Sequence, residues 1–500
     1  MQLIKSTLLP IGAGLFIAQL IATGFVYQSN LEVHQMVLAA QANGYVAIPY
    51  GEAAEALTAW RAAICGGLFY TLSIGVGLTL ATWALWQLWV LVFQKYKRLI
   101  FVLIGLWAAV LVAANVNGPV LFPSLFCFLV PLGTLGCLYK FGPIPSRQNR
   151  LLWMVPAVSL GLLTAIWATQ LNQNLFIAIR DHLLLSNPAG RAVNDFYYRY
   201  TLFAAQCFKS VYQKTLRTYH LEGDIDEREA IKLKSRLLRL DMLHLPQLNK
   251  PDMTIGISKT TVVFTDRHGR RSEEELTSFL KNPGKLLKSF SQTSDRYRPL
   301  RRMTLYGLLL GFPILLFVGV YTVVRIGMEL LFIRGFGYSE VHATFAAALV
   351  CLIIGIALYW PMHTGSMGPV PNKNLPDALT ADAWPMRVAA LRHIEKQGLD
   401  LADYPQYKTF LTSKMPVERY WLARALAVSR SPSTFTDLVS LVEDRHPNVR
   451  CQVYYALGKR GYRRAIQTIK AKMFVSDHWY TQWYGYRALR RLGWHQALSD

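Results

Sequence analysis

The sequence predicts a mainly helical fold in three parts: a polytopic bundle of about seven transmembrane helices, a small soluble α+β domain and a C-terminal α-solenoid of short repeats. Three observations predict it. Of the 500 residues, 52% are hydrophobic and only 17% are charged, the apolar residues gather in blocks, and the last quarter of the chain repeats itself. This composition is typical of membrane proteins rather than of water-soluble ones.

A transmembrane helix needs about 20 apolar residues, and seven stretches approach that length. They are Leu8–Tyr27, Ala62–Phe93, Leu99–Ala114, Leu121–Tyr139, Leu151–Ala168, Leu305–Val324 and Val341–Trp360. The first stretch follows Lys5 in the manner of a signal peptide. Its apolar run is longer than that of a signal peptide and no clear cleavage site follows it, so we interpret it as a retained anchor.

These stretches set the expected domains. They are a five-span bundle over 1–169, a soluble α+β domain with juxtamembrane helices over 170–302, two further spans over 303–361, a linker over 362–376 and repeats over 377–500. In the soluble domain, Thr254–Thr265 is rich in Ile, Val, Thr and Phe and predicts a β-hairpin. The acidic run Glu273–Glu275 predicts the first turn of a helix.

The charges of the short loops indicate how the chain is oriented in the membrane. Residues 28–59 and 115–120 contain no Lys or Arg, whereas 94–98 and 140–150 contain three each. By the positive-inside rule this alternation places the N-terminus in the cytoplasm, in a bacterial inner membrane, and both large soluble regions outside. Four arginines between 296 and 302 favour the opposite side for those regions. One miscounted span would move both soluble regions to the other side of the membrane, so the side that holds them stays open.

The C-terminal region contains four aligned segments that begin at Trp384, Pro416, Pro447 and Trp479. One column holds Arg387, Arg419, Arg450 and Gln482, and a second holds Ala425, Ala456 and Ala488. A third holds Gly398, Gly461 and Gly493, with Arg430 in place of glycine in the second copy. Small Ala lets helices approach closely, and Gly ends a helix in the left-handed conformation. One copy alone cannot bury its apolar face, so we expect the copies to stack.

The third copy runs from Asp444 through Val449-Arg450 to Ala456-Leu457-Gly458. This pattern resembles the short HEAT-like repeat of the phycobilisome-lyase type. The resemblance covers about the last quarter of the chain and implies stacked helices that act as a protein-interaction module. It carries no lyase activity with it, because nothing else in the chain resembles those enzymes. The fourth copy lacks the Asp and the Arg and is expected to be a cap.

Two groups of side chains are candidate contact sites. The repeats carry more Lys and Arg than Asp and Glu, which indicates an acidic partner, a lipid surface or a generally basic solvated face. The arginines are Arg419, Arg450, Arg460, Arg463, Arg464, Arg487, Arg490 and Arg491. The second group is Phe196, Tyr197, Tyr198, Arg199 and Tyr200. It suits an interfacial aromatic belt, with a ligand-binding platform as the alternative.

No catalytic pattern is present. The apolar stretches hold no ionisable residue away from their ends, and the sequence contains no HExxH, CxxC, GxSxG or glycine-rich phosphate motif. We therefore expect no cofactor, no metal and no catalytic residue. The net charge of +23 indicates basic residues in short cytoplasmic loops rather than binding to nucleic acid.

These observations favour a membrane-anchored scaffold or assembly subunit whose repeats and soluble domain bind other membrane or envelope proteins, with lipid as a further contact. The first alternative is a component of a transporter or channel for a neutral or apolar substrate. The second is an enzyme that acts at the membrane surface near Tyr197–Tyr200.

Overall fold

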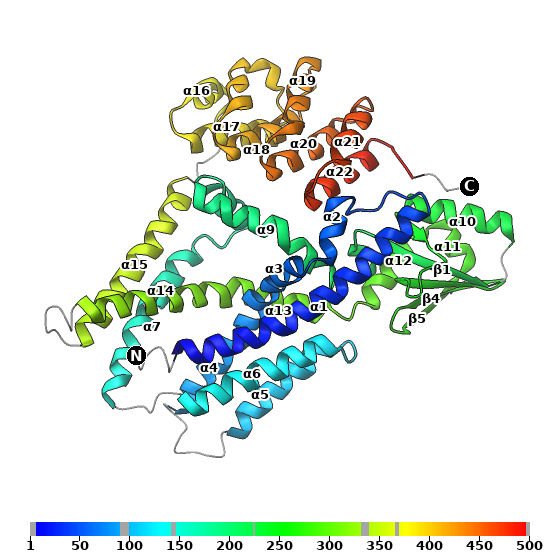
Figure 1. The fold of residues 1–500 in the computed structure, drawn as a ribbon. Coiled ribbons are helices and arrows are strands. Elements are labelled where there is room, and N and C mark those ends of the chain that lie inside the picture. Colours follow the sequence, from blue (N-terminus) through cyan, green and yellow to red (C-terminus); the bar gives the residue numbers. More distant parts are fainter. Residues whose placement is uncertain are drawn as a thin grey trace. The chain divides into compact units, whose positions relative to one another are not determined.

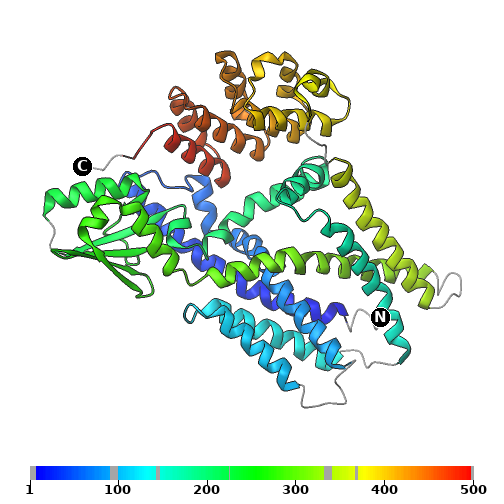
Figure 2. The same cartoon turned by 180° about the vertical axis from the view of Figure 1, so that it is seen from behind.

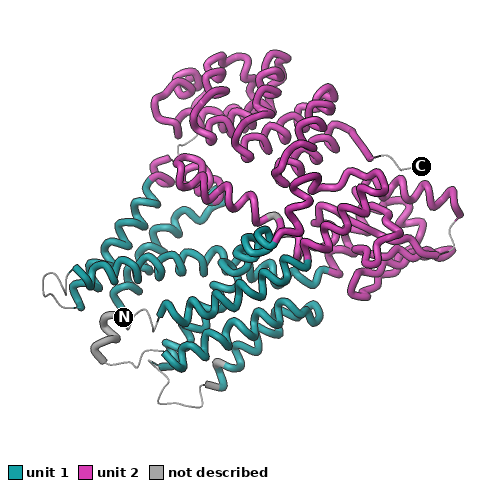
Figure 3. Tube along the Cα trace, viewed as in Figure 1, with its two compact units in different colours: residues 1–28, 60–175, 295–360 teal, residues 29–59, 176–294, 361–500 magenta. Residues whose placement is uncertain are grey.

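A computed structural model describes residues 7–90, 100–141, 147–223, 226–331, 340–365 and 370–496. The described chain is mainly helical and contains one five-stranded sheet (Figures 1 and 2). It forms two compact units, which we describe separately (Figure 3). Unit 1 comprises 1–28, 60–175 and 295–360, and unit 2 comprises 29–59, 176–294 and 361–500.

Unit 1 is a set of mainly apolar helices. They are the first part of α1 (Leu9–Ala42), α3 (Trp60–Tyr70), η3 (Thr71–Gly75), α4 (Val76–Leu88), α5 (Ile100–Ala114), α6 (Leu121–Phe141), α7 (Arg147–Ala168), α13 (Arg298–Tyr306), η8 (Gly307–Gly311), α14 (Phe312–Glu329) and α15 (Glu340–Thr364). Each predicted apolar stretch is helical over its described residues.

Five of these helices are long and apolar enough to cross a membrane, where the sequence had predicted about seven. They are Leu9–Ala42, Trp60–Leu88, Leu121–Phe141, Arg298–Glu329 and Glu340–Thr364. The other two predicted spans appear as shorter apolar helices, Ile104–Ala114 and Met154–Ala168. Both are tied to a longer neighbour, because Trp107 Nε1 donates to the Cys127 carbonyl (2.7 Å) and Ser159 Oγ to the Ala348 carbonyl (3.1 Å).

Large apolar side chains of unit 1 point outward. Phe16 and Leu310 are 64% exposed and Val323 is 68% exposed. Water-soluble proteins rarely leave large apolar patches open, so this surface suits lipid. Small residues allow close helix contacts. A Cβ at Gly307 would meet the backbone of Ser73, and Gly77 lies opposite Gly307.

Unit 2 contains the sheet, with strand order β2-β1-β3-β4-β5. The strands are β1 (Arg217–Gly223), β2 (Met242–His244), β3 (Met253–Ile257), β4 (Thr261–Asp266) and β5 (Arg271–Glu275). β1 is parallel to β2 and β3, and β3–β4 and β4–β5 are antiparallel. The predicted hairpin corresponds to β3 and β4, whose residues alternate between buried and less buried. Helices α10 (Glu227–Arg239), α11 (Leu276–Lys281) and α12 (Pro283–Thr293) share one buried core with the sheet.

One local prediction in this domain is wrong. Glu273–Glu275 belongs to β5 and not to a first helical turn, and α11 begins at Leu276. Val262 of β4 pairs with Glu274, so the acidic run continues the sheet. β5 is an edge strand, where charged side chains discourage pairing with other chains. The strand therefore tolerates a run of carboxylates that sequence reasoning assigned to a helix start.

Residues 29–59 pack in unit 2, although the sequence suggested a continuous bundle over 1–169. The 34-residue helix α1 is about 50 Å long, which exceeds the roughly 30 Å hydrocarbon layer. Its last turns join a core cluster that includes Met36, Ala40 and Leu243. Arg267 Nη1 also pairs with Glu32 Oε2 at 3.0 Å. This end of α1 is therefore part of unit 2.

The repeat helices begin at the four predicted positions. They are α17 (Trp384–Gln397), α18 (Pro416–Leu426), α20 (Pro447–Arg460) and α22 (Trp479–Arg491), with α16 (Leu375–Thr380), η11 (Leu401–Asp403), η12 (Pro405–Thr412), α19 (Pro432–Ser440), η13 (Leu441–Glu443) and α21 (Ala465–Phe474) around them. Each of the four packs on the next in sequence order. Gly398, Gly461 and Gly493 have φ of 69°, 75° and 82°, as the repeat pattern predicted.

The predicted linker over 362–376 is partly helical. Helix α15 continues to Thr364, a 3₁₀ turn covers Asn372–Asn374, and α16 begins at Leu375. Residues 366–369 of the linker lie outside the described residues.

Candidate functional site

The arginine column of the repeats holds the helices together. Arg387, Arg419 and Gln482 each donate to the carbonyl six residues earlier in the chain, at Ala381, Ser413 and Ser476. Each bond therefore fastens the loop before a helix to the first turns of that helix.

Two members of this column also reach the next repeat. Arg387 Nε donates to Glu418 Oε1 at 2.7 Å, and Arg419 Nη2 donates to Asp444 Oδ1 at 3.0 Å. The Arg419 and Asp444 side chains are each only 4% exposed. Arg419 and Asp444 therefore form an internal ion pair. Arg419 does not belong to the surface that the sequence suggested for partners or lipid.

The other seven predicted arginines divide by their surroundings. Arg460 is half-buried and donates to Thr434 Oγ1 (3.0 Å), and Arg490 is half-buried and pairs with Asp241 (3.1 Å). Arg464 is exposed and stacks on Phe435, 3.9 Å from the ring centroid. Arg450 is half-buried, whereas Arg463, Arg487 and Arg491 are exposed. The exposed members are the ones that can meet another molecule.

The predicted aromatic group lies on α9 (Pro188–Gln206), which packs against the repeats. Tyr198 contacts Tyr480 edge to face, with ring centroids 5.0 Å apart, and Asn194 donates to Asn448 Oδ1 at 2.9 Å. Tyr200 is buried. Phe196, Tyr197 and Arg199 remain exposed. Much of this group therefore supports the repeat helices.

Sequence reasoning missed a continuous row of stacked arginines and aromatic rings on the four repeat helices. The Arg392 and Arg424 guanidiniums lie 5.0 and 5.2 Å from the Trp421 ring, and Arg424 and Arg491 lie 5.6 and 5.0 Å from the Tyr455 ring. We call this row, with the exposed Arg487, the arginine–aromatic face. Its members are Arg392, Trp421, Arg424, Tyr455, Arg487 and Arg491.

A sequence signal for this face exists. The ninth residue of each aligned segment is Arg392, Arg424, Tyr455 or Arg487, so one repeat column supplies four of the six members.

The segment before α9 contacts Trp421 of the arginine–aromatic face. It consists of α8 (Leu175–Ala178) and the π-helical turn η6 (Ile179–Leu184). Asp181 is buried and accepts a hydrogen bond from Trp421 Nε1 at 2.8 Å. Arg180 pairs with Asp181 and lies 3.9 Å from the Tyr420 ring centroid. These contacts fix the indole that the other arginines stack on.

Two histidines precede repeat helices and are buried. Burial lowers the pKa of His478 to about 4, with Arg450 acting in the same direction, and burial also lowers the pKa of His446. Neither ring nitrogen of His478 has a hydrogen-bond partner among the described residues, and His446 Nε2 lies 3.6 Å from Asp195 Oδ1. Both imidazoles are therefore neutral in the folded repeats near pH 7.

This burial predicts acid sensitivity. An unfolded His binds a proton below about pH 6.5, whereas folded His478 resists protonation down to about pH 4. Stability is therefore complete above pH 6.5 and decreases as the pH falls toward 4, by up to about 1.4 kcal/mol per pH unit for this group. Thermal unfolding of the His478→Leu variant between pH 7.5 and 5 should decline less steeply than that of the parent. Equal slopes would contradict the assignment.

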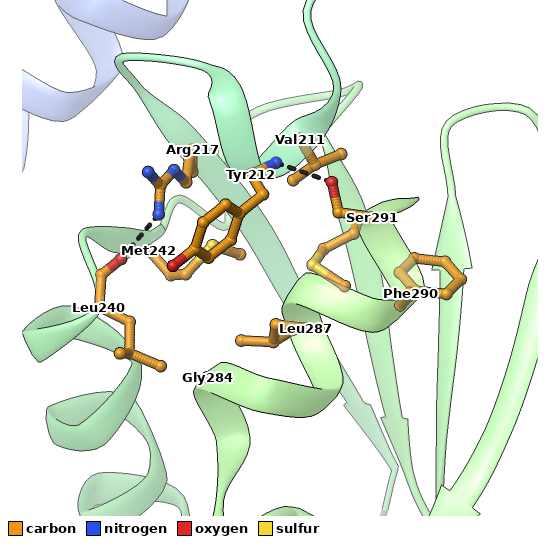
Figure 4. A pocket seen from close by; sticks show the side chains of 10 residues that line it. Val211, Tyr212, Arg217, Leu240, Met242, Gly284, Leu287, Phe290 and Ser291 are labelled. Carbon is orange, nitrogen blue, oxygen red and sulfur yellow. Dashed lines mark hydrogen bonds between the residues drawn. The ribbon is translucent and has the colours of Figure 1, made fainter. Parts of the chain in front are cut away.

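Unit 2 also has a small cavity beneath its sheet (Figure 4). Its volume is about 20 Å³, which leaves room for about one water molecule. The backbone N–H of Tyr212 donates to Ser291 Oγ at 2.9 Å, and Arg217 donates to the Leu240 carbonyl at 3.2 Å. A cavity of this size is a packing gap and is too small for an organic substrate. Among the described residues, no three His, Cys, Asp or Glu side chains gather as metal ligands.

The four repeat helices begin at regular intervals and pack on one another in sequence order, so this part of the chain is a helical repeat region. A family model of HEAT repeats matches residues 407–490, which confirms the predicted HEAT-like repeats at the C-terminus. The apolar helices have no family match. Comparisons with curated proteins and with solved structures give no match.

Proposed function

We propose that this protein is a membrane-anchored scaffold in which unit 1 is the anchor and unit 2 binds a partner protein of the same membrane. HEAT repeats form extended surfaces that bind other proteins. The outward apolar side chains of unit 1 support the anchor.

The observation that carries the proposal is the attachment of the repeats to the rest of unit 2. Gln482 bonds both the N–H and the carbonyl of Tyr50 at 2.9 Å, Trp421 bonds Asp181, and Asn448 bonds Asn194. The repeats are thus fixed to segments that adjoin the apolar helices in sequence. A fixed surface loses less conformational entropy on binding than a tethered tail would.

The same packing limits the number of times that the chain can cross the membrane. Residues 29–59, 176–294 and 361–500 fold into one unit, so they must lie on one side of the membrane. The chain must then cross an even number of times in 60–175 and again in 295–360. Five or seven spans satisfy this requirement and six do not. With seven spans, the basic loops 94–98 and 140–150 both lie opposite unit 2, so the positive-inside rule favours unit 2 outside the cytoplasm. With five spans only 94–98 lies opposite unit 2.

Site-specific photo-crosslinking in intact membranes tests the scaffold proposal without removing any part of the fold. A photoreactive residue is placed at Val475, which is 79% exposed, or at the exposed Lys288 of the sheet domain. We expect a discrete protein adduct from at least one position.

Adducts with lipid alone from both positions, together with a chain that purifies without a partner, would overturn the scaffold proposal. If that lone chain altered solute flux across reconstituted vesicles, the transporter alternative would replace it.

A further inference from the structure

We propose that the arginine–aromatic face binds an acidic, extended segment of the partner protein. This inference rests on the proposed scaffold function and names the chemistry that the repeats recognise. Three independent features of the face carry it: its uncompensated charge, the stacking of its guanidiniums and its spread over several helices.

The charge of the face is only partly neutralised. Arg424 pairs with Glu395 at 2.7 Å. No described carboxylate lies within ion-pair distance of Arg392, Arg487 or Arg491. Three positive charges on one continuous surface attract a ligand of opposite sign and speed its association.

Stacking prepares these guanidiniums for carboxylates. Arg392 stacks on Trp421 and Arg491 stacks on Tyr455, each 5.0 Å from the ring centroid. A stacked guanidinium keeps the N–H groups on its edge available, and these groups match the two oxygens of a carboxylate. Since the rings already limit the side-chain rotamers, less entropy is lost when a ligand binds.

The spread of the charges favours a polypeptide over a small anion. Arg392 lies on α17, whereas Arg487 and Arg491 lie on α22, three helices further along the stack. Packed helices are 8–10 Å apart, so these charges are separated by roughly 25–30 Å. A free phosphate reaches one of them. An extended chain of about eight or nine residues reaches both ends.

The aromatic side chains argue against a lipid surface as the occupant. Of the two rings in the face, Trp421 is only 4% exposed and Tyr455 is half-buried. Rings at a membrane surface project into the headgroup layer, whereas these rings lie beneath the arginines. The face therefore offers charge and hydrogen-bond donors and no projecting apolar anchor.

The test measures binding of a fluorescein-labelled deca-glutamate peptide to the full chain in detergent, by fluorescence anisotropy, with a Gly-Ser peptide of equal length as the uncharged comparison. The face variant is Arg392→Gln, Arg487→Gln, Arg491→Gln. The matched control removes the same charge at exposed positions outside the face, as Lys408→Gln, Lys414→Gln, Arg445→Gln.

We expect the parent and the control to bind deca-glutamate within about twofold of each other, and the face variant to bind on the order of tenfold more weakly. Binding should weaken as salt rises. Three results would overturn the proposal: no binding to the parent, equal weakening in both triple variants, or unchanged peptide binding by the face variant with lost flotation on phosphatidylglycerol vesicles.

The last of these results would assign the face to anionic lipid. Failure here is distinguishable from failure of the scaffold proposal. Crosslinks from Val475 or Lys288 do not depend on the face, so they would persist if only the acidic-segment inference were wrong.

Discussion

Single cysteines at Glu55, Lys288 and Lys408 are expected to react with a membrane-impermeant maleimide from the same side of the membrane, and a cysteine at Lys97 only from the other. The first three positions are exposed and lie in the three segments that fold together as unit 2. Since a folded unit cannot lie on both sides of a bilayer, the labelling should be all or none. The measurement uses intact and inverted vesicles, in a chain whose six native cysteines are replaced.

One further position distinguishes five spans from seven. Val116 is 68% exposed and follows α5. If α5 and α7 both cross, a cysteine at Val116 is labelled from the side of unit 2; if neither crosses, it is labelled from the side of Lys97. Detergent permeabilisation should make every position reactive. Labelling of Lys97 from the side of unit 2 would refute the membrane crossing between residue 59 and Lys97. Labelling of the first three cysteines from different sides would refute the placement of unit 2 on one side of the membrane.

Local sequence patterns predicted those parts of the fold that depend on neighbours along the chain. The four repeat starts and the left-handed glycines at 398, 461 and 493 were predicted because each copy restates the same local requirements. The attachment of the repeats to residues near Tyr50 was not predicted. Gln482 and Tyr50 are 432 positions apart, and such a contact leaves no periodic trace in the sequence.

The candidate site shows the same limit. A count of Lys and Arg predicted a basic repeat surface, but it could not separate an internal cation such as Arg419 from an exposed one such as Arg491. That distinction depends on whether a carboxylate of the neighbouring repeat, here Asp444, lies opposite the guanidinium. Sequence identifies the charge, and only the packing of repeats identifies its partner.

Replacing Arg419 by Ala should destabilise unit 2 by about 3–5 kcal/mol, because the change leaves the Asp444 carboxylate buried without its cation. It also removes the bond to the Ser413 carbonyl before α18. Thermal unfolding of the full chain in detergent measures the loss, and amide hydrogen exchange should locate it in α18 and α20. Arg463→Ala is the matched control, since Arg463 is exposed, and should change stability by less than about 0.5 kcal/mol.

The double variant Arg419→Met, Asp444→Leu separates the ion pair from simple packing. If Arg419 acts by neutralising Asp444, removing both charges should cost less than the sum of the single changes, because no buried charge is left alone. Additive losses, or a loss below about 1 kcal/mol for Arg419→Ala, would show that the pair contributes little. In that case the arginine column would owe its recurrence to the carbonyl bonds at Ala381, Ser413 and Ser476.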